Sequence, residues 1–241
     1  MQLSGKTALV TGGTDGIGAE LIRQLRAKGV TVIAQGRNAE RVAATRSAGF
    51  EVIAADLSTP DGVKTLIDAV AGRQIDILVN NAGAGVDHDF RAAGHPDLVA
   101  ADSTVFLNLN APIHLIAELM STLKARPEAL IANVTSGLAI APMAGSPVYC
   151  ATKAALRSYT MALRAQLKET PVRVLEVLPP VVDTRMTASL SSGKLPVAEC
   201  ARQIMNAMER GTDEANVGQV KMLRVLESIS PALVRRFMLR F

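Results

Sequence analysis

The sequence has little of what extracellular, nucleic-acid-binding and membrane-spanning proteins need. Its 241 residues include two cysteines, Cys150 and Cys200, which is too few for a disulfide framework and typical of a reducing cytoplasm. Tryptophan is absent and aromatic residues make up 3%, which leaves little to stack on nucleic-acid bases. The apolar stretches are far shorter than the about 20 residues of a membrane-spanning helix. We therefore expect a cytoplasmic protein that binds no nucleic acid.

Charge and histidine are also sparse. The formal net charge is only +4, and the three histidines, His88, His95 and His114, lack the spacing of metal ligands, so we expect no metal site. Met1 leads directly into the first apolar run, and we expect no signal or transit peptide. A chain of this length is able to bury a substantial core within one domain, residues 1–241.

Short apolar runs alternate with helical patterns along the whole chain, without a repeat or a low-complexity linker. The expected strands are residues 7–10, 30–34, 51–55, 75–79, 129–134, 172–178 and 219–223. The expected helices are residues 17–27, 40–48, 61–70, 98–124, 147–168 and 196–209. This alternation predicts an α/β fold, in which a doubly wound, mostly parallel seven-stranded sheet has helices on both faces.

A glycine-rich turn, residues 11–18, follows the first expected strand and opens the first expected helix. Glycine lets the backbone approach a pyrophosphate, and a helix N-terminus offers free N–H groups and a positive dipole end. The spacing Gly12-x-x-x-Gly16-x-Gly18 differs from the usual G-x-G-x-x-G of dinucleotide-binding turns. The segment favours dinucleotide binding over a plain strand-to-helix turn.

Tyr149 and Lys153 are four residues apart, so a helix places them on one face. An ammonium group beside a phenol lowers its pKa from about 10, which makes the tyrosine a general acid or base near neutral pH. Ser146 and Pro147 are suited to the N-cap and first position of that helix. Ser136 ends an expected strand but has no Gly-x-Ser-x-Gly elbow, which disfavours a nucleophilic serine.

Four motifs stand in order along the chain: Thr11-Gly-x-x-x-Gly-Ile-Gly18, Asn80-Asn81-Ala82-Gly83, Ser136 and Tyr149-x-x-x-Lys153. Together they resemble the classical short-chain dehydrogenase/reductase family over nearly the whole chain. The resemblance implies a Rossmann fold and an NAD(P)-dependent oxidoreductase. Such an enzyme transfers hydride between the nicotinamide and a carbonyl or secondary alcohol substrate.

The resemblance also implies the catalytic roles. Ser136 orients the substrate carbonyl, Tyr149 exchanges the proton, and Lys153 lowers the pKa of Tyr149 and binds the ribose. Asn108 ties the lysine to a proton-relaying water. Tyr149 and Lys153 also count among the cofactor-binding positions, and the others are Gly12, Thr14, Asp15, Gly16, Ile17, Gly18, Arg37, Asp56, Leu57, Asn81, Ala82, Gly83, Pro179, Val182 and Thr184.

One of these segments departs from the family pattern. Residues 179–184 resemble Pro-Gly-x-Val-x-Thr, but Pro180 replaces the glycine, which removes one N–H and stiffens the turn.

Arg37 predicts a preference for NADP(H), with NAD(H) also possible. It follows the second expected strand, where an NAD enzyme would place an acid for the ribose 2′-hydroxyl. No acid lies between Val30 and Ala39, and the guanidinium matches a 2′-phosphate. Gly36 leaves room for the phosphate. A solvated loop charge is the alternative for Arg37.

The substrate remains open. Apolar residues Leu138, Ile140, Met143 and Met186 are expected to line the pocket, which favours a neutral ketone or aldehyde. A 3-oxoacyl thioester is the alternative substrate. A non-catalytic dinucleotide sensor or scaffold is the alternative function, although Ser136, Tyr149 and Lys153 are all retained.

Two further expectations concern surfaces. The helical patterns over residues 98–124 and 147–168 have apolar residues on more than one face, which predicts a homodimer or homotetramer. Residues 228–241 form a C-terminal amphipathic extension that contains three arginines. We expect this extension to pack on the subunit or its neighbour, and we regard contact with a membrane surface as the less favoured alternative.

Overall fold

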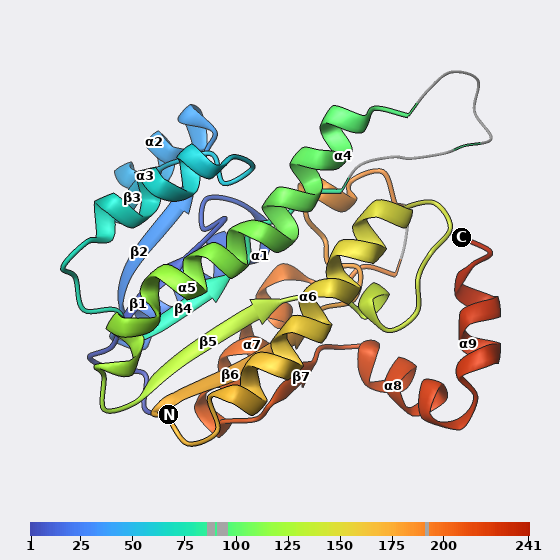
Figure 1. Ribbon diagram of the computed structural model, residues 1–241. Coiled ribbons are helices and arrows are strands. Elements are labelled where there is room, and N and C mark those ends of the chain that lie inside the picture. Colours follow the sequence, from blue (N-terminus) through green and yellow to red (C-terminus); the bar gives the residue numbers. More distant parts are fainter. Residues whose placement is uncertain (86–89, 91–95, 191–192) are drawn as a thin grey trace.

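The computed structural model describes residues 1–85, 90, 96–190 and 193–241. Its seven strands form one sheet in the order β3-β2-β1-β4-β5-β6-β7, and every pairing is parallel (Figure 1). The strands are β1 (Thr7–Val10), β2 (Thr31–Gly36), β3 (Glu51–Ala54), β4 (Ile77–Asn80), β5 (Ala129–Val134), β6 (Val172–Leu178) and β7 (Glu214–Asn216). The expected doubly wound Rossmann fold is confirmed.

Helices cover both faces of the sheet. The structure contains α1 (Gly16–Ala27), α2 (Ala39–Ser47), α3 (Pro60–Val70), α4 (Leu98–Val105), α5 (Ala111–Lys124), α6 (Pro147–Gln166), α7 (Val197–Arg210), α8 (Val220–Ile229) and α9 (Pro231–Met238). One apolar cluster joins α1 and α7 to the sheet, and a second joins α3, α5 and α6 to the other face. Because both faces are covered, β5 is buried at all six positions.

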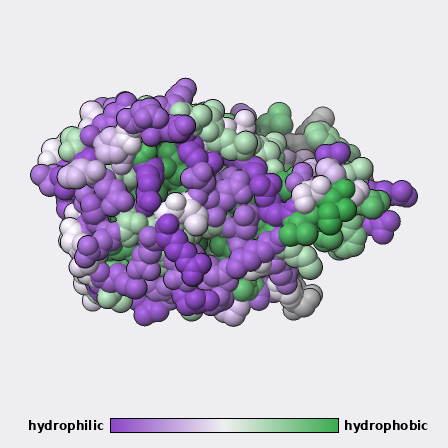
Figure 2. Space-filling model, turned by 90° about the horizontal axis from the view of Figure 1, so that it is seen from below, coloured by the Kyte–Doolittle hydropathy of each residue, from purple (hydrophilic) through white to green (hydrophobic). Residues whose placement is uncertain are grey.

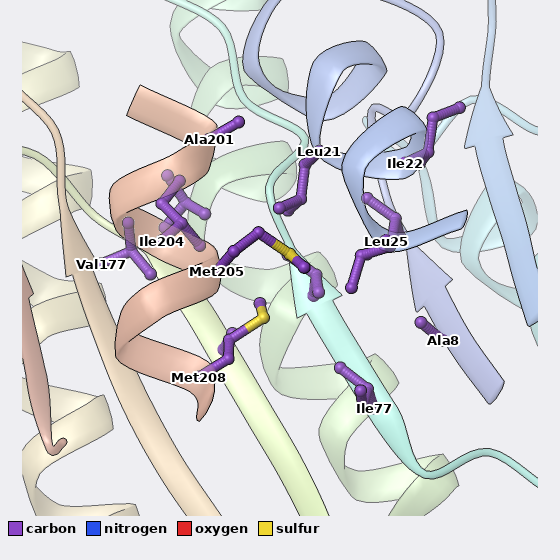
Figure 3. Close-up of a cluster of buried hydrophobic side chains, with 14 of the residues drawn as sticks. Ala8, Leu21, Ile22, Leu25, Ile77, Val177, Ala201, Ile204, Met205 and Met208 are labelled. Carbon is purple, nitrogen blue, oxygen red and sulfur yellow. The ribbon is translucent and has the colours of Figure 1, made fainter. Parts of the chain in front are cut away.

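The α1–α7 contact shows how sequence periodicity builds the first cluster. The apolar residues Leu21, Ile22 and Leu25 recur at helical spacing in α1 and are fully buried. Figure 3 shows Met205 of α7 reaching toward Leu21 and Leu25. Asp15 caps the N-terminus of α1 by accepting a hydrogen bond from the Gly16 N–H. The helix is therefore fixed directly behind the glycine-rich turn.

The strand expected at residues 219–223 is wrong. The last strand is β7 (Glu214–Asn216), and residues 220–229 form α8 instead. Met222, Val225, Leu226 and Ile229 have the i, i+3, i+4, i+7 spacing of a helix, which a five-residue window hides. The segment Glu214–Asn216 has no β-branched or aromatic residue, and it is a strand only because β6 pairs with it.

The long helix expected over residues 98–124 is divided. Between α4 and α5 lies a π-helical turn, Phe106–Asn110, that contains Asn108. π-Helical turns are rare in proteins, and those that occur are often at functional sites. In the part of the chain that the structure describes, no helix has both the length and the apolar composition that crossing a bilayer requires.

The C-terminal extension begins earlier than residue 228, since α8 starts at Val220. Val220 is buried, and in α9 the buried residue is Val234. Most other apolar side chains of this segment are exposed, among them Leu233 at 67% and Phe237 at 56%. The C-terminal extension was expected to pack on the subunit. It does so mainly through the two buried residues Val220 and Val234.

A buried ion pair attaches α6 to the sheet. Glu176 in β6 is fully buried and pairs with the guanidinium of Arg157 in α6. The Thr135 hydroxyl donates a hydrogen bond to the second Glu176 oxygen at 2.7 Å. Arg157 also contacts Glu214 at 3.2 Å. Because α6 bears Tyr149 and Lys153, this pair fixes the helix that positions both residues.

We expect Arg157→Met to reduce the free energy of unfolding by about 3–5 kcal/mol, because it leaves the Glu176 charge buried and unpaired. The double variant Arg157→Met/Glu176→Met should recover most of this loss. Urea unfolding of both variants measures the effect. A double variant as unstable as the single one would show that packing, not the orphaned charge, sets the loss.

Candidate active site

A cavity of about 270 Å³ lies at the carboxyl edge of the sheet. It begins beside the glycine turn after β1, passes the ends of β2 and β4, and reaches Tyr149 and Lys153 of α6. In doubly wound sheets, ligands bind at this edge. The structure brings together fifteen of the expected site residues as cavity lining: Gly12, Thr14, Asp15, Gly16, Ile17, Arg37, Asp56, Leu57, Asn81, Ala82, Gly83, Tyr149, Lys153, Pro179 and Thr184.

Four expected residues do not line the cavity. Gly18 and Asn108 lie behind its wall, Ser136 is buried beside Tyr149, and Val182 packs into the core. Val182 also forms an isolated bridge to Leu195. Of the apolar residues expected to line the pocket, Met186 does so, and Leu138, Ile140 and Met143 do not. The lining residues that sequence reasoning missed are Gln35, Arg41, Leu107, Val134 and Thr135.

A second cavity of about 420 Å³ lies elsewhere, at the end of α6 and the start of β6. It is larger, but it contains none of the expected site residues. Size therefore does not mark the functional site in this protein. The chemistry of the lining side chains does.

The glycine turn has two features that require glycine. Gly12 and Gly16 have φ values of 63° and 49°, a region that residues with side chains rarely adopt. A Cβ atom on Gly18 would lie 2.1 Å from the Gly12 carbonyl oxygen. The turn is thus packed against the start of α1, whose N-terminus is directed at the cavity. This arrangement fits a pyrophosphate.

Thr11 and Asn81 join the glycine turn to the loop after β4. The Thr11 hydroxyl donates to the Val79 carbonyl and accepts from the N–H groups of Asn81 and Ala82 at 2.9 and 3.0 Å. The Asn81 amide donates to the Thr11 carbonyl at 2.9 Å. Two segments 70 residues apart in sequence are therefore fixed side by side along the cavity.

Gln35 of β2 joins the glycine turn to the loop after β3. Its side chain is buried, accepts from the Gly12 N–H at 2.9 Å and donates to the Ala55 carbonyl at 2.6 Å. A glutamine within the apolar run of β2 is the signal that would have identified it, because a buried amide needs partners.

Tyr149 lies in the first turn of α6, where Pro147 follows Ser146 as expected, although the Ser146 side chain makes no capping bond. Ser136 hydrogen-bonds the Tyr149 phenol and also accepts from the Leu138 N–H at 3.1 Å. The Lys153 ammonium donates to the Val134 carbonyl at 2.8 Å and lies 5.7 Å from the centre of the Tyr149 ring.

The expected lowering of the Tyr149 pKa by Lys153 is wrong in direction. Burial raises the pKa of Tyr149 to about 12, and the hydrogen bond from Ser136 offsets only part of this effect. The Tyr149 side chain is half-buried and lines the cavity. Burial also lowers the pKa of Lys153 to about 8. The ammonium is directed at the Val134 carbonyl, so it does not offset the desolvation of the phenol.

Asn108 stands behind Gly83 in the π-helical turn. Its amide donates to the Ala84 carbonyl at 2.8 Å and to the Thr152 hydroxyl at 3.0 Å, and its oxygen accepts from the Ala84 N–H. A Cβ atom on Gly83 would lie 3.2 Å from that oxygen and 3.4 Å from the Lys153 nitrogen. Asn108 and Lys153 therefore both lie against the position that a side chain on Gly83 would occupy.

Charged side chains gather at the other end of the cavity. The Arg37 guanidinium lies 3.2 Å from a carboxylate oxygen of Asp56. Arg185 pairs with Asp15 at 2.6 Å, and Arg41 lies 3.8 Å from the same carboxylate. Arg41 and Arg185 had no sequence signal, because 26 and 170 residues separate them from Asp15.

One detail beside the arginines differs from expectation. Gly36 does not leave open space, because a Cβ atom there would lie 2.4 Å from the Thr14 hydroxyl oxygen. In the segment after β6, Pro179 accepts from the Gly137 N–H through its carbonyl, and the Thr184 N–H donates to Thr187 at 3.2 Å. The Thr184 side chain faces the cavity, even though Pro180 replaces the family glycine.

His114 is not among the residues that line this cavity. His114 packs edge-on against Phe106, with ring centres 5.6 Å apart. His88 and His95 lie outside the described residues. Within residues 1–85, 90, 96–190 and 193–241, no three histidine, cysteine, aspartate or glutamate side chains are grouped so that they could hold a metal ion.

A parallel sheet with a glycine turn at one end of its edge cavity and Ser136, Tyr149 and Lys153 at the other defines a dinucleotide-dependent oxidoreductase. The family described as short chain dehydrogenase matches residues 6–195, and the chain belongs to that family. The sequence-based recognition is confirmed.

Comparisons with individual proteins agree with this family membership. The chain is 36% identical to an uncharacterized oxidoreductase, DltE, of Bacillus subtilis (strain 168), over 93% of this chain and 92% of that protein. A short chain dehydrogenase from Burkholderia cenocepacia J2315 in complex with NADP has a TM-score of 0.88 and 27% identity, and 99% of both chains is covered. A second structure, from Burkholderia phymatum in complex with NAD, shares the fold at 21% identity and a TM-score of 0.77 over 89% of both chains.

We expect Lys153→Met to raise the free energy of unfolding at pH 7 by about 2 kcal/mol. Each pKa unit corresponds to about 1.4 kcal/mol, and the unpaired Val134 carbonyl offsets about 1 kcal/mol of the gain. The folded-state pKa of Lys153, about 8, lies below its ordinary value of 10.5. The cost of burying the charge is therefore complete below pH 8 and disappears above pH 10.5.

Urea unfolding of both proteins from pH 7 to pH 10.5 measures the difference. The advantage of the methionine variant should shrink steadily over that range. A variant less stable than the wild type at pH 7, or a difference independent of pH, would contradict the assignment of a buried ammonium.

Proposed function

We propose that this oxidoreductase transfers hydride between NADP(H) and a neutral ketone or aldehyde, or the corresponding secondary or primary alcohol. The observation that carries the proposal is the grouping of Ser136, Tyr149 and Lys153 at one end of a cavity whose other end has a glycine turn and two arginines. The cavity spans both halves of a dinucleotide.

The residues present fit the cofactor. Gly12 and Gly16 form a cradle beside the α1 N-terminus that suits the pyrophosphate, and side chains there would close it. Asp56 and Leu57 line the end suited to adenine, and Pro179 and Thr184 line the end suited to nicotinamide. The loop 81–83 lies between these two ends. The bound cofactor supplies or accepts the hydride.

The chain's own residues handle the proton. A phenol with a pKa raised to about 12 keeps its proton at neutral pH, so Tyr149 is ready to donate it to the substrate oxygen during reduction. Ser136 hydrogen-bonds that phenol and is positioned to polarise the carbonyl. Lys153 donates to the Val134 carbonyl at the wall of the cavity and is the residue that would hold the ribose. Asn108 positions Gly83 and Thr152 around Lys153.

The substrate proposal rests on apolar side chains in and near the cavity. Met186, exposed at 57%, lines it, and Leu138, Ile140 and Met143 are partly exposed in the segment after β5 without lining it. These side chains suit an apolar carbonyl compound. Arg185 is the nearby cation, but its guanidinium pairs with Asp15. A 3-oxoacyl thioester is the second candidate substrate, and a non-catalytic dinucleotide sensor is the candidate function of another class.

The cofactor preference rests on Arg37 and Arg41. Both line the same end of the cavity, where two guanidinium groups suit a 2′-phosphate. The Burkholderia cenocepacia relative was crystallised with NADP, which supports the proposal, whereas the more distant relative from Burkholderia phymatum was crystallised with NAD.

The proposal also covers the oligomeric state of the protein and its cellular location. Leu98 and Val99 of α4 and Met161 of α6 are large apolar residues with 51–77% exposure, which supports a homodimer or homotetramer built on these helices. We treat residues 1–241 as one domain. The two free, buried cysteines, Cys150 and Cys200, support a cytoplasmic location.

Tyr149→Phe should reduce kcat for carbonyl reduction by about 10²–10⁴, because it removes the transferable proton with little change in packing. Steady-state oxidation of NADPH against a panel of ketones and aldehydes measures this effect. Tyr159→Phe, which changes the only other tyrosine, is the matched control and should leave kcat unchanged. Near-normal turnover by Tyr149→Phe on a confirmed substrate would refute the assignment.

Arg37→Ala should raise KM for NADPH by roughly ten- to hundredfold, the value of a charge-assisted hydrogen bond, and change KM for NADH little. Arg41→Ala should act in the same direction. Arg23→Ala, an exposed arginine of α1 outside the cavity, is the control. Equal effects on both cofactors, or a wild-type enzyme that prefers NADH, would contradict the preference.

A further inference from the structure

The C-terminal helices α8 and α9 present an apolar surface to solvent. Of the fifteen large apolar side chains exposed in the described residues, eight belong to the last 23 residues. We call them the C-terminal patch: Met222, Val225, Leu226, Ile229, Leu233, Phe237, Leu239 and Phe241, with exposures of 48–74%. Figure 2 shows a green area at the end of the molecule where Figure 1 places α8 and α9.

α8 has apolar side chains on two sides: Val220 and Leu223 lie near Gly137 of the subunit, and a second set faces solvent. Its apolar stripe, Met222, Val225, Leu226 and Ile229, is exposed. The half-buried Arg224 is instead on the inner side, where it pairs with Glu214 of β7 at 3.2 Å. A helix that places its apolar stripe outward and its ion pair inward is suited to a partner outside the subunit.

Charge is concentrated in the same segment. Residues 219–241 contain five basic and one acidic residue, and so account for the whole formal net charge of +4. The remaining 218 residues contain 21 basic and 21 acidic residues. Arg235, Arg236 and Arg240 of this segment are exposed and form no ion pair with a described residue. The patch is therefore a basic, apolar surface on an otherwise neutral protein.

The patch contacts the rest of the subunit at both ends. A Cβ atom on Gly137 would lie 3.0 Å from the Val220 side chain, so α8 packs closely on the turn after Ser136. The Phe241 carbonyl accepts a hydrogen bond from the Gly145 N–H at 3.2 Å. The two aromatic rings of Phe237 and Phe241 pack edge-on with centres 5.4 Å apart. The helices are thus already formed, and docking does not require the folding of a short, marginal helix.

We propose that the C-terminal patch docks on an anionic lipid bilayer surface. Binding of an interfacial amphipathic helix grows with its buried apolar area and with basic residues beside it, and both are present here. A second copy of the chain is the less favoured occupant. A two-fold contact through this patch would bring the unpaired Arg235, Arg236 and Arg240 of the two copies together. The inference goes beyond the proposed function, because it does not depend on the reaction.

The test is sedimentation of the full-length protein with vesicles. We expect it to pellet with phosphatidylcholine vesicles that contain roughly a third phosphatidylglycerol at about 0.01 M salt, less so at about 0.15 M, and little with phosphatidylcholine alone. Arg236→Gln/Arg240→Gln should weaken binding about 25-fold, or about fivefold for each charge. Ile229→Ser/Phe237→Ser should weaken binding at both salt concentrations.

Matched double variants elsewhere serve as controls. Lys124→Gln/Arg210→Gln removes two exposed charges, and Val181→Ser/Leu190→Ser removes two exposed apolar side chains, and none of these residues belongs to the patch. Each control should bind within about twofold of the wild type.

Three results would overturn the proposal. In the first, the wild type stays in the supernatant with anionic vesicles at low salt. In the second, the controls lose as much binding as the patch variants. In the third, Ile229→Ser/Phe237→Ser pellets like the wild type but sediments as a smaller species without vesicles. That result would show that a second copy covers the patch.

Discussion

The close approach of Gly18 to Gly12 is the contact on which the rest of the site depends. With no Cβ atom at position 18, the start of α1 packs onto the glycine turn, and the Asn81 amide reaches the Gly12 carbonyl at 3.3 Å. This places the positive end of α1 at the cavity and fixes the loop after β4 beside it. Any side chain at position 18 would separate these three elements. The wall of the cavity beside the glycine turn is therefore held in place by backbone contacts.

The end of the cavity that Tyr149 and Lys153 line depends on buried polar groups instead. Asn80 donates to Asn133 at 2.9 Å, and Asn133 donates to Thr160 of α6 at the same distance, so β4, β5 and α6 are joined within the core. The pair of Arg157 and Glu176 makes a second attachment of α6 to β6. Buried hydrogen bonds have narrow geometry, whereas apolar contacts allow a helix to slide. These attachments therefore fix where Tyr149 and Lys153 stand relative to the sheet edge.

Burial sets the protonation of both groups. It favours the neutral form of each, so it raises the pKa of Tyr149 to about 12 and lowers that of Lys153 to about 8. Both residues are on one helical face, but proximity in sequence did not produce the expected ion–phenol interaction. The Val134 carbonyl, at the end of β5, is the acceptor that the ammonium meets at 2.8 Å. At neutral pH the site is thus arranged with a protonated phenol, which suits reduction of a carbonyl.

The sequence by itself determined the fold, because helices and strands were visible in the local spacing of apolar residues. It also located the glycine turn, Ser136, Tyr149 and Lys153, since each belongs to a short local motif. It placed the second strand within two residues of β2 but missed β7, whose residues have no strand preference and depend on pairing with β6.

Only the tertiary structure decided the contacts that crossovers create. Arg41 and Arg185 reach Asp15, and Gln35 reaches the glycine turn, over separations that no local pattern records. Burial, and with it the direction of each pKa shift, likewise follows from what packs around a group and not from its neighbours in sequence. The tertiary structure also decided which face of α8 is exposed. Periodicity in the sequence defines an apolar stripe but not the side of the helix on which the subunit lies.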